Sequence, residues 1–121
     1  MRAEVLVVED EKDLVTTYER LLRRHGCSVV SVGTVHDGLA ALDSRRFALV
    51  IADLRLPDGT GLDIVRSARR VDGPPVIVVT GFSSSQSRRE ALDAGATAYV
   101  VKPFSVLALS SLIQEALTPP A

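Results

Sequence analysis

Four short runs of apolar residues constrain the fold of this chain more than any other feature. Residues 5–8, 49–52, 76–79 and 99–101 are apolar at every position. A strand that buries one face alternates apolar and polar residues, whereas a run without polar residues predicts a strand covered on both faces. Strands of that kind form parallel sheets with helices packed against each side. The chain is therefore predicted to form an open parallel sheet.

Helical segments separate these runs along the sequence. Apolar residues at helical spacing, with capping residues or glycines at the ends, predict helices over residues 12–25, 34–44, 62–71, 86–94 and 105–117. The last helix is expected to bury Val106, Leu109, Ile113 and Leu117. An additional strand, 28–32, mixes serine with valine, as an edge strand does. The alternation predicts a doubly wound α/β fold, in which five helices flank a five-stranded parallel sheet of order 2-1-3-4-5.

The composition indicates one small domain and excludes several classes of protein. A length of 121 residues fits a single domain, and a net charge of −1 gives no sign of a nucleic-acid or membrane partner. The single Cys27 excludes an internal disulfide. No apolar stretch approaches the ~18 residues of a membrane span, and the first strand begins too early to leave room for a signal peptide. We therefore expect a cytoplasmic protein that binds neither nucleic acid nor membrane directly.

Polar residues close four of the predicted strands. Glu9 and Asp10 follow the first run, and Asp53, Thr80 and Lys102 follow the other three. The carboxyl ends of parallel strands share one edge of the sheet, where open α/β folds bind their ligands. Three carboxylates at that edge would repel one another unless they hold a cation, and Mg²⁺ prefers such oxygen ligands. The pattern predicts a metal-assisted phosphoryl site.

Asp53 is the best nucleophile of this set because it lies between the acidic pair and Lys102. A carboxylate can attack phosphorus to form an acyl phosphate. Lys102 and Mg²⁺ would offset the charge of the transferring group, and Thr80 offers a hydroxyl donor. Simpler interpretations remain for single residues: Glu9 and Asp10 as caps of the following helix, and Asp53 as a turn residue.

Two other functions are compatible with the same fold. A phosphatase or phosphotransferase with an aspartyl nucleophile commonly has a second Asp two residues later, where this chain has Arg55. A nucleotide- or flavin-binding module would have a Gly-rich turn after the first strand, where this chain has three acidic residues, 9–11. The sequence thus matches either of these two patterns less well than it matches a phosphoryl-accepting carboxylate site.

Four motifs resemble those of a known family, the receiver domain of bacterial two-component response regulators. They are Val-Val-Glu9-Asp10, Asp53-Leu-Arg-Leu-Pro57-Asp-Gly59, Val-Val-Thr80-Gly81 and Tyr99-Val-Val-Lys102-Pro103-Phe104. Each motif is weak alone, but the four in this order are specific, and the resemblance covers about residues 3–117. It implies a flavodoxin-like fold, for which the strand order 2-1-3-4-5 is known from a chemotaxis member of the family.

The resemblance implies a role for each residue at the predicted edge. Asp53 would be the phosphoacceptor for a histidine kinase, and slow self-phosphorylation and autodephosphorylation would be the only catalysis. Mg²⁺ would be held by Asp10 directly, by Glu9 largely through water, by Asp53 and by the backbone carbonyl of Arg55. Lys102 would contact the phosphoryl group.

The resemblance also implies a conformational switch. Thr80 would move to the new phosphoryl group, and Tyr99 would follow inward to fill the space that Thr80 leaves. The peptide bond before Pro103 is expected to be cis. Phosphorylation would then change the surface formed by residues 86–94, 98–101 and 105–117, which would control an output domain or a downstream protein.

Residues that flank the site are expected to tune the lifetime of the phosphorylated form. Arg55 and Phe82 would border the mouth of the pocket, with Phe82 hindering attack by water, and Gly81 would leave room for the phosphodonor. Residues 1–121 are interpreted as a single receiver domain, and 118–121 as the start of a linker to an output domain. A phosphorylation-dependent dimer is a further expectation, although the last helix lacks the charged residues used in one well-known dimer of the family.

Overall fold

The computed structural model describes residues 2–70 and 73–118 and confirms the predicted order of elements. The elements are β1 (Glu4–Val8), α1 (Lys12–Arg24), β2 (Ser28–Val32), α2 (Val35–Ser44), β3 (Leu49–Ala52), β4 (Arg55–Leu56), β5 (Gly59–Thr60), α3 (Leu62–Arg70), β6 (Val76–Thr80), α4 (Ser85–Ala94), β7 (Ala98–Val101) and α5 (Val106–Leu117). The predictions for Val71 and for residues 119–121 fall outside the described residues.

Five parallel strands form the central sheet in the order β2-β1-β3-β6-β7. This is the predicted order 2-1-3-4-5 of the five main strands, with β2 at one edge. In register, Val8 pairs with Ala52, and Ala52 pairs with Val78. The residues that follow β1 and β3 therefore emerge side by side at the carboxyl edge of the sheet.

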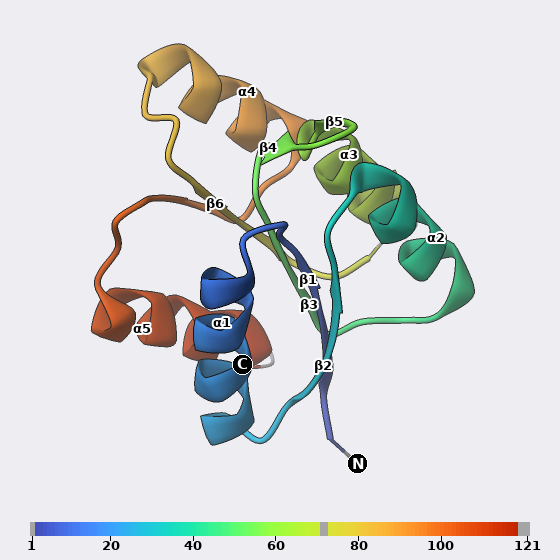
Figure 1. Ribbon diagram of the computed structural model, residues 1–121, viewed down its shortest axis with the longest axis vertical. Helices are drawn as coiled ribbons and strands as arrows, with labels where there is room; N and C mark the ends of the chain where they lie inside the picture. The colour runs from blue at the N-terminus through green and yellow to red at the C-terminus, as the bar shows by residue number, and fades with distance from the viewer. Residues whose placement is uncertain (1, 71–72, 119–121) are drawn as a thin grey trace.

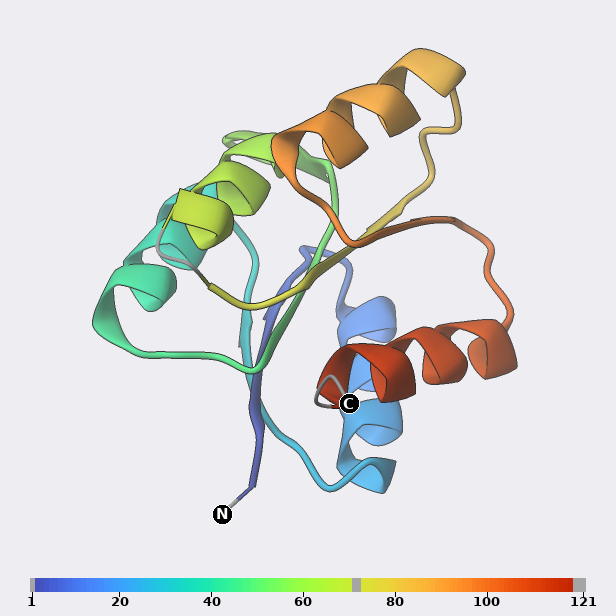
Figure 2. The same cartoon turned by 180° about the vertical axis from the view of Figure 1, so that it is seen from behind.

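Helices cover both faces of the sheet, which explains why the strands are apolar throughout. Figures 1 and 2 show α1 and α5 on one face and α2, α3 and α4 on the other. Alternate residues of β1 enter opposite layers: Val5 and Val7 pack toward α1 and α5, and Leu6 and Val8 pack toward α2 and α3. All four side chains are fully buried. No helix within the described ranges is long and apolar enough to cross a membrane.

The segment after β3, which contains Pro57, Gly59 and Gly61, forms a short hairpin. Its β4 and β5 pair antiparallel, with Arg55 opposite Thr60. Beyond this pairing, the Asp58 carboxylate accepts hydrogen bonds from the backbone N–H groups of Val35 at 2.8 Å and His36 at 2.9 Å. These N–H groups belong to the first turn of α2 and have no partner within the helix. Asp58 therefore fastens the segment after β3 to α2.

Helix α5 corrects one prediction about the core. Leu109 and Ile113 are fully buried, as expected, but Leu117 is only partly buried and Val106 is 47% exposed. Ser105 caps the helix, since its hydroxyl accepts a hydrogen bond from the N–H of Ala108 at 3.2 Å. Val106 lies in the first turn, before the point where the helix meets the sheet. The prediction that Val106 belongs to the helix was therefore correct, but the prediction that it is buried was wrong.

Gly61 is expected to be indispensable because it packs against the backbone of Asp53. A Cβ atom at this position would lie 2.0 Å from the Asp53 carbonyl oxygen. We expect Gly61→Ala to lower the free energy of unfolding by about 3 kcal/mol, within the range for overpacking a core. Urea denaturation should show this loss, whereas Gly33→Ala, whose nearest neighbours would be at 3.8 Å, should lose far less. Equal stability of the two variants would contradict the steric interpretation.

Asp58 should make stability depend on pH. The hydrogen bonds from His36 and Val35 lower the pKa of Asp58. A carboxyl group with a lowered pKa stabilises the fold above its unfolded pKa of about 3.9, and that contribution is lost as pH falls through the folded pKa. Asp58→Asn should therefore be less stable than wild type at pH 7, with a difference that shrinks below about pH 4. Urea denaturation across this range tests it, with Asp43→Asn, an exposed carboxylate near the other end of α2, as the control. A difference that stays constant with pH would contradict it.

Candidate functional site

The ammonium group of Lys102 lies at the centre of the predicted site. Its Nζ donates to Asp53 Oδ2 at 2.8 Å and to Glu9 Oε1 at 2.9 Å, and lies 3.4 Å from Glu11 Oε1. These residues follow β7, β3 and β1, so they come from three separate parts of the chain. Glu9 and Asp53 are buried, while Lys102 is partly buried. Two buried carboxylates thus share one ammonium group.

Asp10 completes a cluster of three carboxylates. Carboxylate oxygens of Glu9, Asp10 and Asp53 lie within 4.8 Å of one another. The backbone pairing explains this proximity, because the N–H of Asp53 donates to the carbonyl of Val8 at 3.0 Å and so continues the ladder between β1 and β3. Glu9 and Asp53 face the buried side of this edge, whereas Asp10 is exposed.

Burial and hydrogen bonding have opposing effects on the pKa of Glu9 and on the pKa of Lys102. Burial raises the pKa of Glu9, although the hydrogen bond from Lys102 works against that shift. For Lys102, burial lowers the pKa, but the hydrogen bonds to Asp53 and Glu9 outweigh burial and leave the pKa raised. The ammonium group therefore stays charged near neutral pH. The single ammonium group of Lys102 therefore faces several carboxylates.

The donor set fits a hard divalent cation. The three clustered side chains offer only carboxylate oxygens, and a fourth carboxylate, that of Glu11, lies beside Lys102. One ammonium group cannot balance four carboxylates. Mg²⁺ typically binds through one or two carboxylates and keeps several waters. The residues present therefore suit Mg²⁺ better than a metal that requires nitrogen or sulfur ligands.

Thr80 ends β6 at the same edge, but its hydroxyl is not bonded to the carboxylates. It is fully buried, and its Oγ1 accepts a hydrogen bond from the N–H of Phe82 at 3.2 Å. Its carbonyl accepts from the N–H of Lys102 at 2.8 Å. Thr80 thus links the segment that leads into α4 with the backbone of the central lysine.

The Tyr99 side chain is tied to the segment between β6 and α4. Its hydroxyl donates to the carbonyl of Phe82 and lies 3.0 Å from the hydroxyl of Ser87. Its ring packs against the core layer beneath α2, α3 and α4. The tyrosine and Thr80 therefore contact the same residue, Phe82, one through its carbonyl and the other through its N–H.

Arg55 and Phe82 stack on each other beside the carboxylates. The Arg55 guanidinium carbon lies 4.2 Å from the centre of the Phe82 ring, and Phe82 is 43% exposed. The N–H of Arg55 also donates to Asp53 Oδ1 at 3.1 Å.

The predicted cis peptide bond between Lys102 and Pro103 is confirmed.

Glu11 is a member of the site that the sequence interpretation missed. Its N–H donates to Glu9 Oε2 at 3.2 Å, and its carboxylate approaches Lys102. The only signal in the sequence was its position directly after the acidic pair. That position alone is equally typical of an exposed residue at the start of a helix, and Glu11 is indeed the N-terminal boundary residue of α1.

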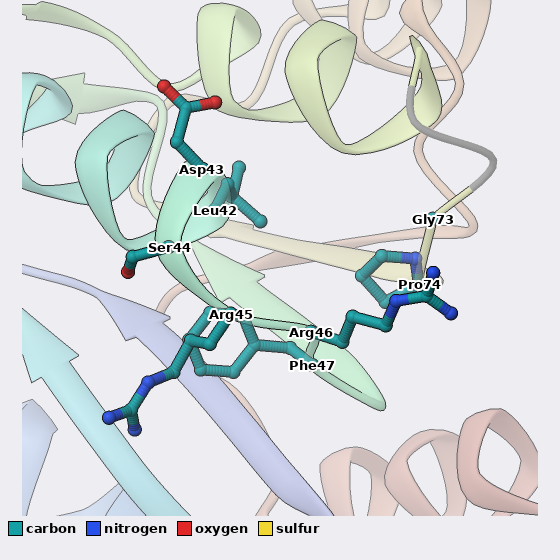
Figure 3. Close-up of a pocket in the computed structure, with 8 residues that line it drawn as sticks. All are labelled: Leu42, Asp43, Ser44, Arg45, Arg46, Phe47, Gly73 and Pro74. Carbon is teal, nitrogen blue, oxygen red and sulfur yellow. The ribbon is translucent and has the colours of Figure 1, made fainter.

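A pocket at the opposite edge of the sheet does not share this convergence. It lies before β3 and β6 and is lined by Leu42, Asp43, Ser44, Arg45, Arg46, Phe47, Gly73 and Pro74. Figure 3 shows the Asp43 carboxylate and the two guanidinium groups pointing in different directions. Arg45 is already paired with Glu4 at 3.0 Å. The carboxyl edge is therefore the better candidate site.

Comparison with known proteins agrees with this geometry. Residues 5–114 match the model of the response regulator receiver domain. The chain is 37% identical over 113 residues to the KDP operon transcriptional regulatory protein KdpE of Escherichia coli, covering 93% of this chain and 50% of that protein. It is 35% identical over 114 residues to the response regulator ArlR of Staphylococcus aureus, covering 94% and 52%. The chain thus spans about half the length of these relatives.

A solved structure shows the same fold. The receiver domain of the sensor histidine kinase PA1611 from Pseudomonas aeruginosa, described with magnesium in its active-site cleft, superposes with a TM-score of 0.84. It is 28% identical, and the match covers 97% of this chain and 98% of that one. Mg²⁺ binding at the active site is a property of the family. The chain therefore belongs to the response regulator receiver domains, which act as phosphorylation-activated switches of two-component signalling rather than as conventional enzymes.

Proposed function

We propose that Asp53 is the residue that accepts the phosphoryl group from a histidine kinase. The observation that carries this proposal is the way its carboxylate is held. Lys102 donates to Oδ2 at 2.8 Å and the N–H of Arg55 donates to Oδ1 at 3.1 Å. Both oxygens are thus oriented, with the buried Glu9 and the exposed Asp10 close by. Such positioning and charge compensation supply most of what phosphoryl transfer requires of a protein.

The transfer step forms one bond and breaks one. An oxygen of Asp53 attacks the phosphorus of a phosphohistidine, the P–N bond breaks, and the imidazole nitrogen keeps the electron pair. Lys102 then neutralises a phosphoryl oxygen. Glu9, Asp10, Asp53 and the carbonyl of Arg55 would hold Mg²⁺, which supplies positive charge beside the phosphoryl oxygens.

Thr80 and Tyr99 are proposed as the switch that reads this event. A phosphoryl oxygen would accept a hydrogen bond from the Thr80 hydroxyl and draw it away from the N–H of Phe82, from which Oγ1 accepts at 3.2 Å. Tyr99 is held by the carbonyl of the same residue. A change at Thr80 would therefore alter the segment that fixes Tyr99 and α4. Phosphorylation of one residue would thus shift the equilibrium between two conformations of the domain.

The surface formed by α4, β7 and α5 is proposed to pass the signal on. Exposed apolar side chains occur on all three elements, and Leu107 is 81% exposed. Exposed apolar groups are typical of sites that bind another protein. The matched stretch is about half the length of each relative, and one of them is named a transcriptional regulatory protein. The proposed target of this surface is an output domain or a downstream protein. A dimer that forms on phosphorylation would also be held together through exposed surface of this domain.

Phosphorylation with a small phosphodonor tests the proposed acceptor. We expect acetyl phosphate with Mg²⁺ to add one phosphoryl group to the wild type, and slow hydrolysis to remove it after the donor is withdrawn. Asp53→Asn should gain none because an amide is a poor nucleophile. Intact mass spectrometry measures both, with and without Mg²⁺.

Asp63→Asn provides the control, since this carboxylate is exposed on α3 and pairs with Arg66. It should be phosphorylated like the wild type. A phosphorylated Asp53→Asn would move the acceptor to another residue. No phosphorylation of the wild type under any condition would contradict the proposal as a whole.

The Arg55–Phe82 stack should lengthen the life of the acyl phosphate. A cation–π contact contributes about 0.5–1 kcal/mol at an exposed site, and every 1.4 kcal/mol is a factor of ten. If the stack shields the phosphoryl group from water, Phe82→Ala should speed hydrolysis by about two- to fivefold. Mass spectrometry after removal of the donor measures the rate.

The double variant of Arg55 and Phe82 separates a stack from two independent effects. Arg55→Ala should also speed hydrolysis, and the two changes together should do little more than either alone, because each removes the same contact. A lifetime unchanged in Phe82→Ala would refute the shielding role.

A further inference from the structure

The hydroxyl of Tyr18 is buried without a hydrogen-bond partner. The side chain lies on α1 and is 1% exposed. Within the part of the chain that the structure describes, its oxygen is the only buried side-chain polar atom left unsatisfied. A buried hydroxyl without a partner costs about 1–3 kcal/mol relative to a satisfied one. Leucine or phenylalanine would fill this core position without that cost, so the hydroxyl calls for an explanation.

The surroundings of Tyr18 connect it to the acidic site. Burial raises the pKa of Tyr18, and the negative charges of Glu9 and then Asp53 raise it further. Geometry places Glu9 on the same side of the sheet as Tyr18: the N–H of Glu9 donates to the carbonyl of Val32 at 2.9 Å and so continues β1, on the face whose Val5 and Val7 pack in one core layer with Tyr18. The hydroxyl has no hydrogen-bond partner in this structure. The ring also stacks on Phe104 at 5.9 Å between centres, two residues beyond Lys102. Tyr18 thus touches the segment that carries the lysine and lies on the same side of the sheet as the Glu9 carboxylate that the lysine binds.

Glu9 is the group that would gain from such a donor. Its Oε2 accepts from the N–H of Glu11 at 3.2 Å, and its Oε1 accepts from Lys102 at 2.9 Å. If the Glu9 carboxylate turns toward a cation that it shares with Asp10, its buried Oε1 loses its strongest partner, Lys102. A buried carboxylate that loses its donor is strongly destabilised. The Tyr18 hydroxyl is a neutral donor on the buried side, where water cannot easily replace the lysine.

We propose that Tyr18 is a positioning residue of this site, and that its hydroxyl donates a hydrogen bond to the Glu9 carboxylate when that carboxylate serves a divalent cation. The inference rests on the proposed function, because it requires Glu9 and Asp10 to hold Mg²⁺. Outer-shell donors of this kind fix the orientation of a ligand, and their loss typically weakens metal binding. The aromatic stack on Phe104 keeps the hydroxyl in place.

Removing the hydroxyl alone tests the inference. Tyr18→Phe keeps the ring and its stack on Phe104, so we expect the fold to remain intact and, without Mg²⁺, to be no less stable in urea. Mg²⁺ affinity, measured by calorimetric titration of the whole chain, should fall roughly ten- to hundredfold, the loss typical when an outer-shell partner of a metal ligand is removed. Thr17→Val, which removes a hydroxyl from the neighbouring position on the same helix, should bind Mg²⁺ like the wild type.

A spectroscopic readout follows the hydroxyl directly. The chain has two tyrosines, so protein labelled with ¹³C at the tyrosine Cζ gives two signals, and Tyr18→Phe identifies one of them. We expect the Tyr18 signal to move when Mg²⁺ is added, as a new hydrogen bond forms. Equal Mg²⁺ affinities of wild type and Tyr18→Phe, or an unmoved Tyr18 signal, would overturn the role of Tyr18 while leaving the metal site intact. Failure of the wild type itself to bind Mg²⁺ would instead overturn the metal site of the proposed function, and this inference with it.

Discussion

One ammonium group shared by two buried carboxylates holds the candidate site together. Lys102 donates to both Glu9 and Asp53, and the three residues follow strands β7, β1 and β3. Taking charges out of water is costly, and only good geometry offsets the cost. That geometry exists because the strands end together at one edge of the sheet. The site and the fold therefore depend on each other.

Burial of both faces of the sheet determines where chemistry can occur. Helices α1 and α5 cover one face and α2, α3 and α4 cover the other (Figure 1). The side chains of the inner strands are shielded from solvent along almost the whole strand. The functional groups of this sheet therefore lie where the strands end. The charged groups gather at the carboxyl edge, while the charged groups of the pocket at the other edge do not converge (Figure 3). This is the arrangement that open α/β folds use for ligand binding.

The main residues of the site could be predicted because strand ends are visible in the sequence. Glu9, Asp10, Asp53 and Lys102 each follow an apolar run, and their meeting requires only the correct strand order. The contact of Glu11 with Lys102 could not be predicted in this way, because Glu11 belongs to the turn into α1 and its direction depends on how the helix leaves the sheet. Thr80 was predicted at the edge, but its bond to the N–H of Phe82 follows from the path of the next loop.

The sequence by itself determined the alternation of strands and helices and the polar residues at the strand ends, because hydrophobic periodicity and position relative to a strand end are local properties. The strand order is not local, and its prediction also used the mixed composition of the edge strand and the resemblance to a known family. Only the tertiary structure decided that Val106 is exposed, that Arg55 stacks on Phe82 and that the Tyr18 hydroxyl lies buried without a hydrogen-bond partner. These features join residues that are distant in sequence, or depend on where a helix first meets the sheet. They are fixed by packing between elements, which no local pattern records.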